Sequence, residues 1–175
     1  MNRFIPQYCP QCGQAKLQQI DVKQWSCNSC QFVYFHNMAS TAGAILLYQQ
    51  QVLLVSRAVK PQKGDWDLPG GFVEYGESLE QGLQRELYEE LQLSVELQSL
   101  QYFGSFANRY HYKQVLYHTC DSFFSCKLNQ QPNLKALDDV ATWQWHPIAA
   151  LPFHKIAFSS VHQALLQLQT QVQTV

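Results

Sequence analysis

The segment between residues 71 and 93, GFVEYGESLEQGLQRELYEELQL, constrains the fold of this chain more than any other segment. Its leucines recur at every fourth position from Leu79 to Leu91, which is the spacing of one face of an α-helix. Ser78 is a suitable N-terminal cap, and Gln81 follows three positions later, as in a capping box. The sequence therefore predicts an amphipathic helix over residues 78–91 whose apolar face packs against a sheet.

The polar side of this helix is acidic. Five glutamates lie between residues 77 and 90, and Arg85 is the only cation among them. A helix turns by about 100° per residue, so Glu86, Glu89 and Glu90 fall within an arc of roughly 100°. Like charges at this spacing cost about 0.2–0.5 kcal/mol per pair. A solvated surface helix and a site for a divalent cation such as Mg²⁺ or Mn²⁺ are both open interpretations.

The same segment resembles the Nudix box, G-x5-E-x7-R-E-U-x-E-E-x-G-U, where U is a bulky aliphatic residue. The matching residues are Gly71, Glu77, Arg85, Glu86, Leu87, Glu89, Glu90 and Leu93. Gln92 stands where the family has glycine, just after the helix, where a positive φ is common. We expect this glutamine either to cost roughly 1 kcal/mol of backbone strain or to shift the turn, without removing a charged group. The resemblance covers roughly residues 38–165 and includes WDLPGG and WHPIAALP.

The resemblance implies a fold, a reaction and a set of roles. The fold is α/β, a Nudix-type α/β/α sandwich with a mixed sheet. The reaction is metal-dependent hydrolysis of a diphosphate bond in a nucleoside diphosphate linked to another group. The implied ligands of the catalytic Mg²⁺ or Mn²⁺ are Glu86, Glu89, Glu90 and the Gly71 carbonyl. Arg85 and Glu77 are expected to orient these ligands.

The general base stays open. Glu86 or Glu89 is a candidate within the box, and Asp121 and the pair Asp138–Asp139 are candidates outside it. The alternative for Asp121 is that it ends or caps a strand, and the alternative for the aspartate pair is an ordinary loop. Arg57 and Tyr110 are further candidates for contact with the substrate. The alternatives are that Arg57 is an ordinary surface arginine and that the Tyr110 ring packs in the core.

The first 37 residues contain two C-x-x-C pairs separated by 14 residues. Two such pairs can place four thiolates around one Zn²⁺ ion, here Cys9, Cys12, Cys27 and Cys30. A unit of this size has little core, so the metal would supply its folding energy. Its few cations favour a folding role over nucleic-acid binding. We therefore expect a zinc ribbon over residues 1–37 and a Nudix domain over residues 38–175, with Cys120 and Cys126 as ordinary strand residues.

The rest of the chain has an α/β pattern. Apolar runs predict strands over residues 41–48, 51–58, 93–107, 113–128 and 141–148. Residues 60–71 contain proline, glycine and aspartate and indicate a loop. The segment from Ile156 shows helical spacing at Val161, Leu165 and Leu168.

The net charge of −1 gives no global attraction to nucleic acid or to anionic lipid, so we expect neither as a partner. The sequence shows no signal-peptide pattern and no run of 18 apolar residues, and we expect a cytoplasmic protein.

A zinc ribbon followed by a Nudix domain resembles the NADH diphosphatase branch, and this resemblance implies a homodimer. The S-Q-P-W-P-F-P-x-S signature of that branch is missing from residues 99–110. The substrate therefore stays open among NADH, FAD, ADP-ribose and dinucleoside polyphosphates. The alternatives are a catalytically silent nucleotide-binding or regulatory module and an RNA 5′-end pyrophosphohydrolase.

Overall fold

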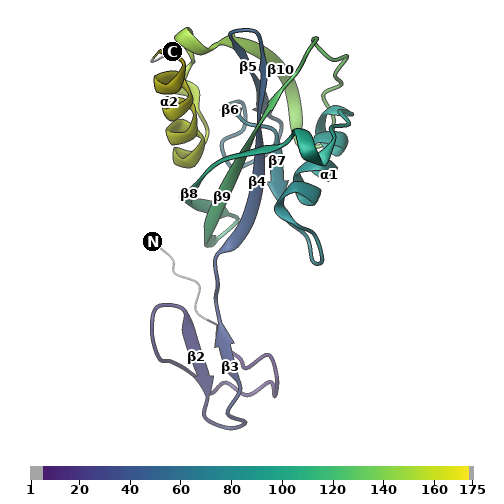
Figure 1. Ribbon diagram of the computed structural model, residues 1–175. Helices are drawn as coiled ribbons and strands as arrows, with labels where there is room; N and C mark the ends of the chain where they lie inside the picture. Colours follow the sequence, from purple (N-terminus) through teal and green to yellow (C-terminus); the bar gives the residue numbers. More distant parts are fainter. Residues whose placement is uncertain (1–5, 174–175) are drawn as a thin grey trace.

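The computed structural model describes residues 6–173, which form two separate β-sheets (Figure 1). The first five residues of the predicted ribbon and the last two of the predicted Nudix domain lie outside the described residues. The smaller sheet is antiparallel and contains β1 (Leu17–Gln19), β2 (Gln24–Cys27) and β3 (Val33–Phe35). Trp25 is its main apolar residue, 2% exposed and packed against Tyr34 with ring centroids 5.8 Å apart.

The larger sheet is mixed. Its main path runs in the order β10-β5-β4-β9-β8, and β4 and β9 are parallel while the other neighbours are antiparallel. Two short strands complete it, β6 beside β5 and β7 beside β4. The strands are β4 (Ala39–Tyr48), β5 (Gln51–Arg57), β6 (Trp66–Asp67), β7 (Gly70–Phe72), β8 (Gln101–Tyr112), β9 (Val115–Lys127) and β10 (Val140–Pro147).

Two α-helices cover opposite faces of this sheet (Figure 1). Helix α1 (Leu79–Leu91) packs with Ala44 and Leu46 of β4, whereas α2 (Ser159–Gln173) packs with Ile45 between them. Successive side chains of a strand point to opposite faces, so this alternation places one apolar core on each side. Three short 3₁₀ turns connect elements: η1 (Leu97–Ser99), η2 (Ile148–Ala150) and η3 (Phe153–Lys155). The predicted α/β/α sandwich is confirmed.

Strands β4 and β5 stay paired only next to their hairpin, at Leu47 with Val52 and at Tyr48 with Gln51. Beyond that point they separate, and β7 pairs with β4 while β6 pairs with β5. Gly70 permits this close approach, because a Cβ there would lie 2.2 Å from the Ala42 carbonyl oxygen at a φ of +138°. The sheet is therefore split where the acidic helix meets it.

The ends of α1 agree with the sequence prediction. The Ser78 hydroxyl accepts a hydrogen bond from the Gln81 amide, and the Gln81 side chain accepts one from the Ser78 amide. At the other end Gln92 has a φ of +52° and a ψ of +31°, the left-handed conformation expected of the family's glycine. The amides of Gln92 and Leu93 close the helix on the carbonyls of Tyr88 and Leu87.

Two predictions about the connections were wrong. The strand expected over residues 93–107 starts only at Gln101, because Leu93, Val95 and Leu100 pack into the core beneath α1. Gln84 of α1 holds this segment by donating a hydrogen bond to the Val95 carbonyl at 2.6 Å. The stretch 60–71, expected to be a loop, contributes β6 and the first part of β7.

Candidate active site

A cleft of about 350 Å³ opens where the sheet splits, between α1, the β6–β7 connection, β8, β9 and the start of α2. Eight carboxylate side chains and two guanidinium groups line it. The carboxylates belong to Asp67, Glu74, Glu86, Glu89, Glu90, Asp121, Asp138 and Asp139, and the guanidinium groups to Arg57 and Arg85. An excess of acid this large in one concave site is expected where cations are bound.

Arg85 connects the glutamates of the box. Its Nε and Nη2 donate to the two carboxylate oxygens of Glu77 at 2.8 and 3.1 Å, and its Nη1 donates to Glu86 at 2.9 Å and to Glu89 at 3.0 Å. Nη2 also donates to the Phe72 carbonyl. The Arg85 guanidinium lowers the pKa of Glu77, which does not line the cleft. Glu77 therefore contacts the cleft-lining residues Arg85 and Glu74 without reaching the cleft itself.

Glu86 and Glu90 are held against the backbone before the helix. A Cβ on Gly71 would lie 2.6 Å from Glu86 Oε1, so the glycine leaves the room that this carboxylate occupies. Glu90, 7% exposed, accepts a hydrogen bond from the Gly70 amide at 2.9 Å. Burial raises the pKa of both glutamates, and that of Glu90 lies well above its usual range. Buried carboxylates with so few donors are suited to compensation by a cation.

The three predicted glutamate ligands share the cleft but are not gathered on one point. Within residues 6–173, the one group of three or more potential ligand residues with ligand atoms within 4.8 Å of one another is the cysteine cluster. Glu86 and Glu89 point to Arg85, while Glu90 points to Gly70. Their oxygen donors fit a hard divalent ion such as Mg²⁺ or Mn²⁺. The assignment of the individual ligands stays a prediction.

Arg57 and Tyr110 both line the cleft. Arg57 forms an ion pair with Asp67 at 2.9 Å, and its guanidinium lies 5.0 Å from the centroid of the Phe158 ring. The Tyr110 ring lies 5.6 Å from the centroids of both Phe72 and Phe158. Burial of Asp67 raises its pKa to about 6, against the opposing effect of Arg57. Arg57 is therefore not a freely exposed surface arginine.

The acids outside the box also lie at the cleft. Asp121 is in the middle of β9, so the alternative that it ends or caps a strand was wrong. Its two oxygens accept hydrogen bonds from the hydroxyls of Thr41 at 2.8 Å and Ser160 at 2.6 Å. Asp138 and Asp139 form the turn before β10, as a loop assignment requires, and both line the cleft.

Sequence reasoning missed several residues of the cleft: Asp67, Glu74, Asn108, Thr119 and Phe158. Asp67 belongs to WDLPGG, so its proximity to the box was an available signal. Asn108 and Thr119 carry no such signal, because only the pairing of β8 with β9 brings them opposite each other.

A sequence model of the NUDIX domain matches residues 38–168, three quarters of the chain. The chain belongs to the Nudix family. Among solved structures, a NUDIX hydrolase from Nitrosomonas europaea superposes with a TM-score of 0.70 at 23% identity, covering 95% of this chain and 92% of that one. At this identity the similarity shows the fold.

Two curated relatives of this Nudix protein are informative. The NAD-capped RNA hydrolase NudC of Haemophilus influenzae (strain PittGG) is 30% identical over 109 residues, 60% of this chain and 40% of the relative. The mitochondrial NAD(P)H pyrophosphatase NUDT13 of Homo sapiens is 33% identical over 99 residues, 57% of this chain and 27% of the relative. The match thus spans less than half the length of either relative.

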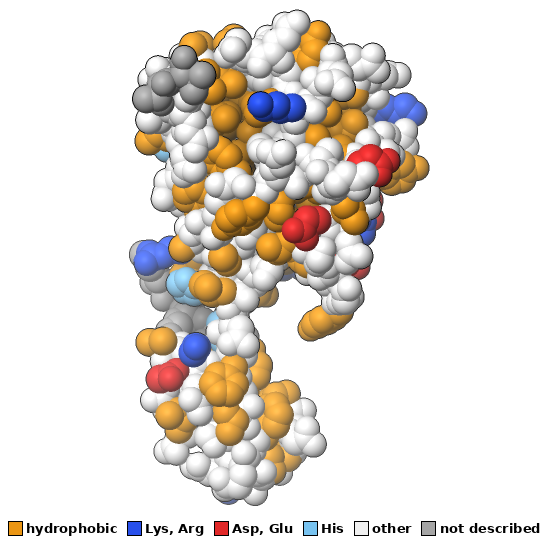
Figure 2. Space-filling model, viewed as in Figure 1, with side chains coloured by type: hydrophobic (Ala, Val, Ile, Leu, Met, Phe, Trp, Pro, Cys, Tyr) orange, Lys and Arg blue, Asp and Glu red, His pale blue; other side chains and the backbone are white. Residues whose placement is uncertain are grey.

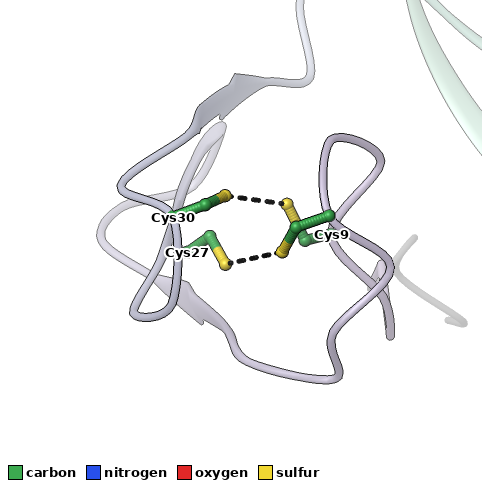
Figure 3. A group of neighbouring side chains, drawn as sticks. Cys9, Cys27 and Cys30 are labelled. Carbon is green, nitrogen blue, oxygen red and sulfur yellow. Dashed lines mark hydrogen bonds between the residues drawn. The ribbon is translucent and has the colours of Figure 1, made fainter.

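The N-terminal unit of this Nudix protein holds the cysteine cluster (Figure 3). The sulfurs of Cys9 and Cys30 lie 3.7 Å apart, as do those of Cys12 and Cys27. A Zn–S bond of about 2.3 Å implies an edge of about 3.8 Å in a tetrahedron of four thiolates. The amide of Cys30 lowers the pKa of the Cys27 thiol, whereas burial and the neighbouring sulfurs raise that of Cys30 against the effect of the Phe32 amide, so the thiols of the cluster influence one another. The cluster therefore has the dimensions of a zinc site.

The face seen in Figure 2 carries few charged side chains, and hydrophobic ones stand out on the cysteine-bearing unit at its lower end. Tyr8, Ile20, Val22, Val33 and Phe35 of that unit are exposed. No helix within residues 6–173 is long and apolar enough to cross a membrane.

Proposed function

We propose that this Nudix protein hydrolyses the diphosphate bond of a nucleoside diphosphate linked to a second group. The observation that carries the proposal is the cleft in which the glutamates of the box meet acids from three other segments, next to aromatic rings. The substrate class includes NADH, FAD, ADP-ribose and dinucleoside polyphosphates. Names of relatives such as NAD(P)H pyrophosphatase favour a dinucleotide.

In this proposal Glu86, Glu89, Glu90 and the Gly71 carbonyl hold Mg²⁺ or Mn²⁺. The bound ion would neutralise the diphosphate and acidify a bound water. Arg85 fixes the orientation of Glu86 and Glu89, and Glu77 fixes Arg85 in turn. Glu89 is the best-placed general base of the box, because its side chain is 47% exposed against 15% for Glu86. Asp121 is less suited to accept a proton, since both its oxygens already accept hydrogen bonds.

A turnover assay tests the proposal. NADH, FAD, ADP-ribose and a dinucleoside polyphosphate are offered in parallel with Mg²⁺ or Mn²⁺, and released phosphomonoesters are counted. The wild type should turn over at least one, and Glu90→Gln should lose that activity while keeping its circular dichroism spectrum. Glu96→Gln is the matched control, because Glu96 is exposed and outside the cleft. Nucleotide binding without turnover in the wild type would instead support a catalytically silent module.

The 5′ end of an RNA is a second candidate substrate, favoured by the name of the NudC relative. A second hollow adjoins the cleft through Asn108 and Phe158, and Arg109, His111 and His118 line it. These side chains could contact phosphates that continue beyond a cap. Turnover of a short dinucleotide-capped RNA should then fall steeply with added salt, whereas turnover of NADH should change little. Equal salt dependence would remove this candidate.

We further propose that residues 1–37 form a zinc ribbon and residues 38–175 the Nudix domain. The sulfur spacings of the four cysteines support zinc, and the family match that starts at residue 38 supports the boundary. Metal analysis of the purified protein should find about one zinc per chain. A homodimer and a cytoplasmic location remain predictions, which sedimentation and cell fractionation would test.

A further inference from the structure

One buried hydroxyl at the cleft has no partner. Thr119 is 1% exposed, and its Oγ1 makes no hydrogen bond. The described residues contain three other buried side-chain polar atoms without a partner, on Trp25, Trp145 and His146, and none of these residues lines the cleft. A buried polar group left unpaired costs about 1–3 kcal/mol, so its presence in a concave site calls for an explanation.

Two polar side chains lie beside this hydroxyl on the same face of the sheet. Asn108 of β8 is directly opposite Thr119, and Asp121 follows two positions later on β9. Both are 8% exposed, and both line the cleft. The Asn108 amide oxygen accepts a hydrogen bond from Ser159, which leaves its NH₂ group as the part that can donate to a ligand. The three side chains thus present a donor, a hydroxyl that can donate or accept, and a carboxylate whose oxygens already accept from Thr41 and Ser160 and keep lone pairs for one further donor.

Aromatic rings stand over the same part of the cleft. Tyr110 is two residues from Asn108 on β8, and Phe158 precedes the serines that contact Asn108 and Asp121. The two rings are 5.6 Å apart, and Phe72 is 42% exposed beside Tyr110. Rings of this kind bind the face of a planar heterocycle, while the polar group can bind its edge.

The position of this group relative to the box fits one extended ligand. Gly71 of β7 pairs with Ala42 of β4, and β9 pairs with β4 on its other side. Two strand spacings of about 4.8 Å place β9 roughly 10 Å from β7. The same cleft is lined by Thr41, Ala42 and Gly43 of β4, so a ligand whose phosphates face Glu86 would pass these residues to place a ring near Thr119.

We propose that Asn108, Thr119 and Asp121 form a specificity site for a planar heterocycle that carries a hydrogen-bond acceptor next to an N–H donor. The carboxamide edge of nicotinamide and the amino–imino edge of adenine share this chemistry. The proposal rests on the proposed function, since it assigns one end of the same substrate. Thr119 is a residue that selects the substrate and takes no part in the bond cleavage.

Binding of mononucleotides in the presence of Mg²⁺ tests this site by titration calorimetry, independently of turnover. The probes are nicotinamide mononucleotide and AMP, each paired with an analogue of altered edge, nicotinic acid mononucleotide and IMP. The wild type should prefer at least one probe over its analogue. Thr119→Val should lower the affinity for that probe by about five- to tenfold, because one hydrogen bond is lost. It should also remove the preference for the probe over its analogue. Thr119→Ser keeps the hydroxyl, so it should bind the probe with wild-type affinity and keep the preference over the analogue.

Stability separates this role from a structural one. Thr119→Val removes an unpaired buried hydroxyl, so its melting temperature should equal or exceed that of the wild type. Unchanged probe affinities in Thr119→Val, or an equal loss for probe and analogue, would overturn the specificity site. If the wild type turns over substrate but Thr119→Val binds the probes with unchanged affinity, the proposed hydrolase function is supported and the specificity site is refuted. Selective binding without any turnover would retain the site and refute the hydrolase.

Discussion

At the scale of single residues, the site depends on two consecutive glycines that serve different purposes. Gly70 has a φ of +138° and touches the backbone of β4, so its lack of a side chain lets the two strands meet. Gly71 has ordinary backbone geometry, and its missing Cβ makes room for the Glu86 carboxylate. One position therefore maintains the fold, whereas the other maintains the position of a proposed metal ligand.

This difference predicts separable effects of alanine. Gly71→Ala should displace Glu86, because the new Cβ would lie 2.6 Å from its Oε1, and should reduce metal affinity and turnover by roughly 10–100-fold. Its melting temperature should change little. Metal titrations followed by activity and calorimetry measure both effects. Gly104→Ala is the control, because the added Cβ would be 3.4 Å from Phe106 and away from the cleft. A folded Gly71→Ala protein with wild-type metal affinity would contradict this role.

Arg85 provides the second prediction at this scale. Its guanidinium serves three glutamates at once, and a lysine ammonium cannot reproduce that planar fork. Arg85→Lys keeps the charge, so a loss of turnover of roughly 10–100-fold would come from the orientation of Glu86 and Glu89. The measurement is kcat at saturating Mg²⁺ beside Lys127→Arg, a charge-preserving control at an exposed position outside the cleft. Full activity of Arg85→Lys would show that only the positive charge matters.

At the scale of the element, α1 shows how far sequence could predict this site. The leucine row and the Ser78–Gln81 capping box are local signals, and both gave the observed helix. The fourfold leucine spacing also placed the acidic face correctly relative to the core. The segment after the helix was assigned wrongly, because an alternation of apolar residues predicts a strand equally well when the residues pack beneath a helix.

On the polar side of the cleft the sequence singled out only Asp121, and it could not show which residues lie beside it. Asn108, Thr119 and Asp121 come together only through the register of β8 with β9 and of β9 with β4. Strand pairing over such distances is set by the whole sheet and leaves no local spacing in the sequence. The cysteine cluster was predictable, since its ligands form two short local motifs.

The C-terminal end of α1 supports a stability prediction. Gln92 adopts the left-handed conformation at φ +52°, which costs a side-chain-bearing residue roughly 1 kcal/mol relative to glycine. Gln92→Gly should therefore stabilise the protein by about 1 kcal/mol in urea unfolding. Gln167→Gly, an exposed position inside α2, should destabilise it by about the same amount. A loss of stability in Gln92→Gly would mean that the glutamine side chain contributes a compensating contact.

At the scale of the whole molecule, the two sheets have separate means of stabilisation. The larger sheet has an apolar core on each face, whereas the smaller one relies on Trp25 and the cysteine cluster. None of the described residues before Ala39 lines the cleft. Between the small sheet and the larger one, the ring centroids of His36 and Tyr117 lie 6.3 Å apart. Loss of order in the smaller sheet should therefore leave the larger one folded.

Removal of the proposed zinc ion tests this independence by hydrogen exchange. The four thiolates would be left to repel one another around an unfilled centre, and a sheet with one large buried side chain cannot replace the folding energy of the metal. After treatment with a zinc chelator, the amides of β1–β3 should lose their protection, while those of β4, β5 and β9 keep theirs. Cys120→Ser should leave both patterns unchanged, because Cys120 lies outside the cluster. If the amides of β4 and β9 exchanged together with those of β2, the two sheets would form one cooperative unit, and the ribbon would contribute to the stability of the cleft as well as to its own folding.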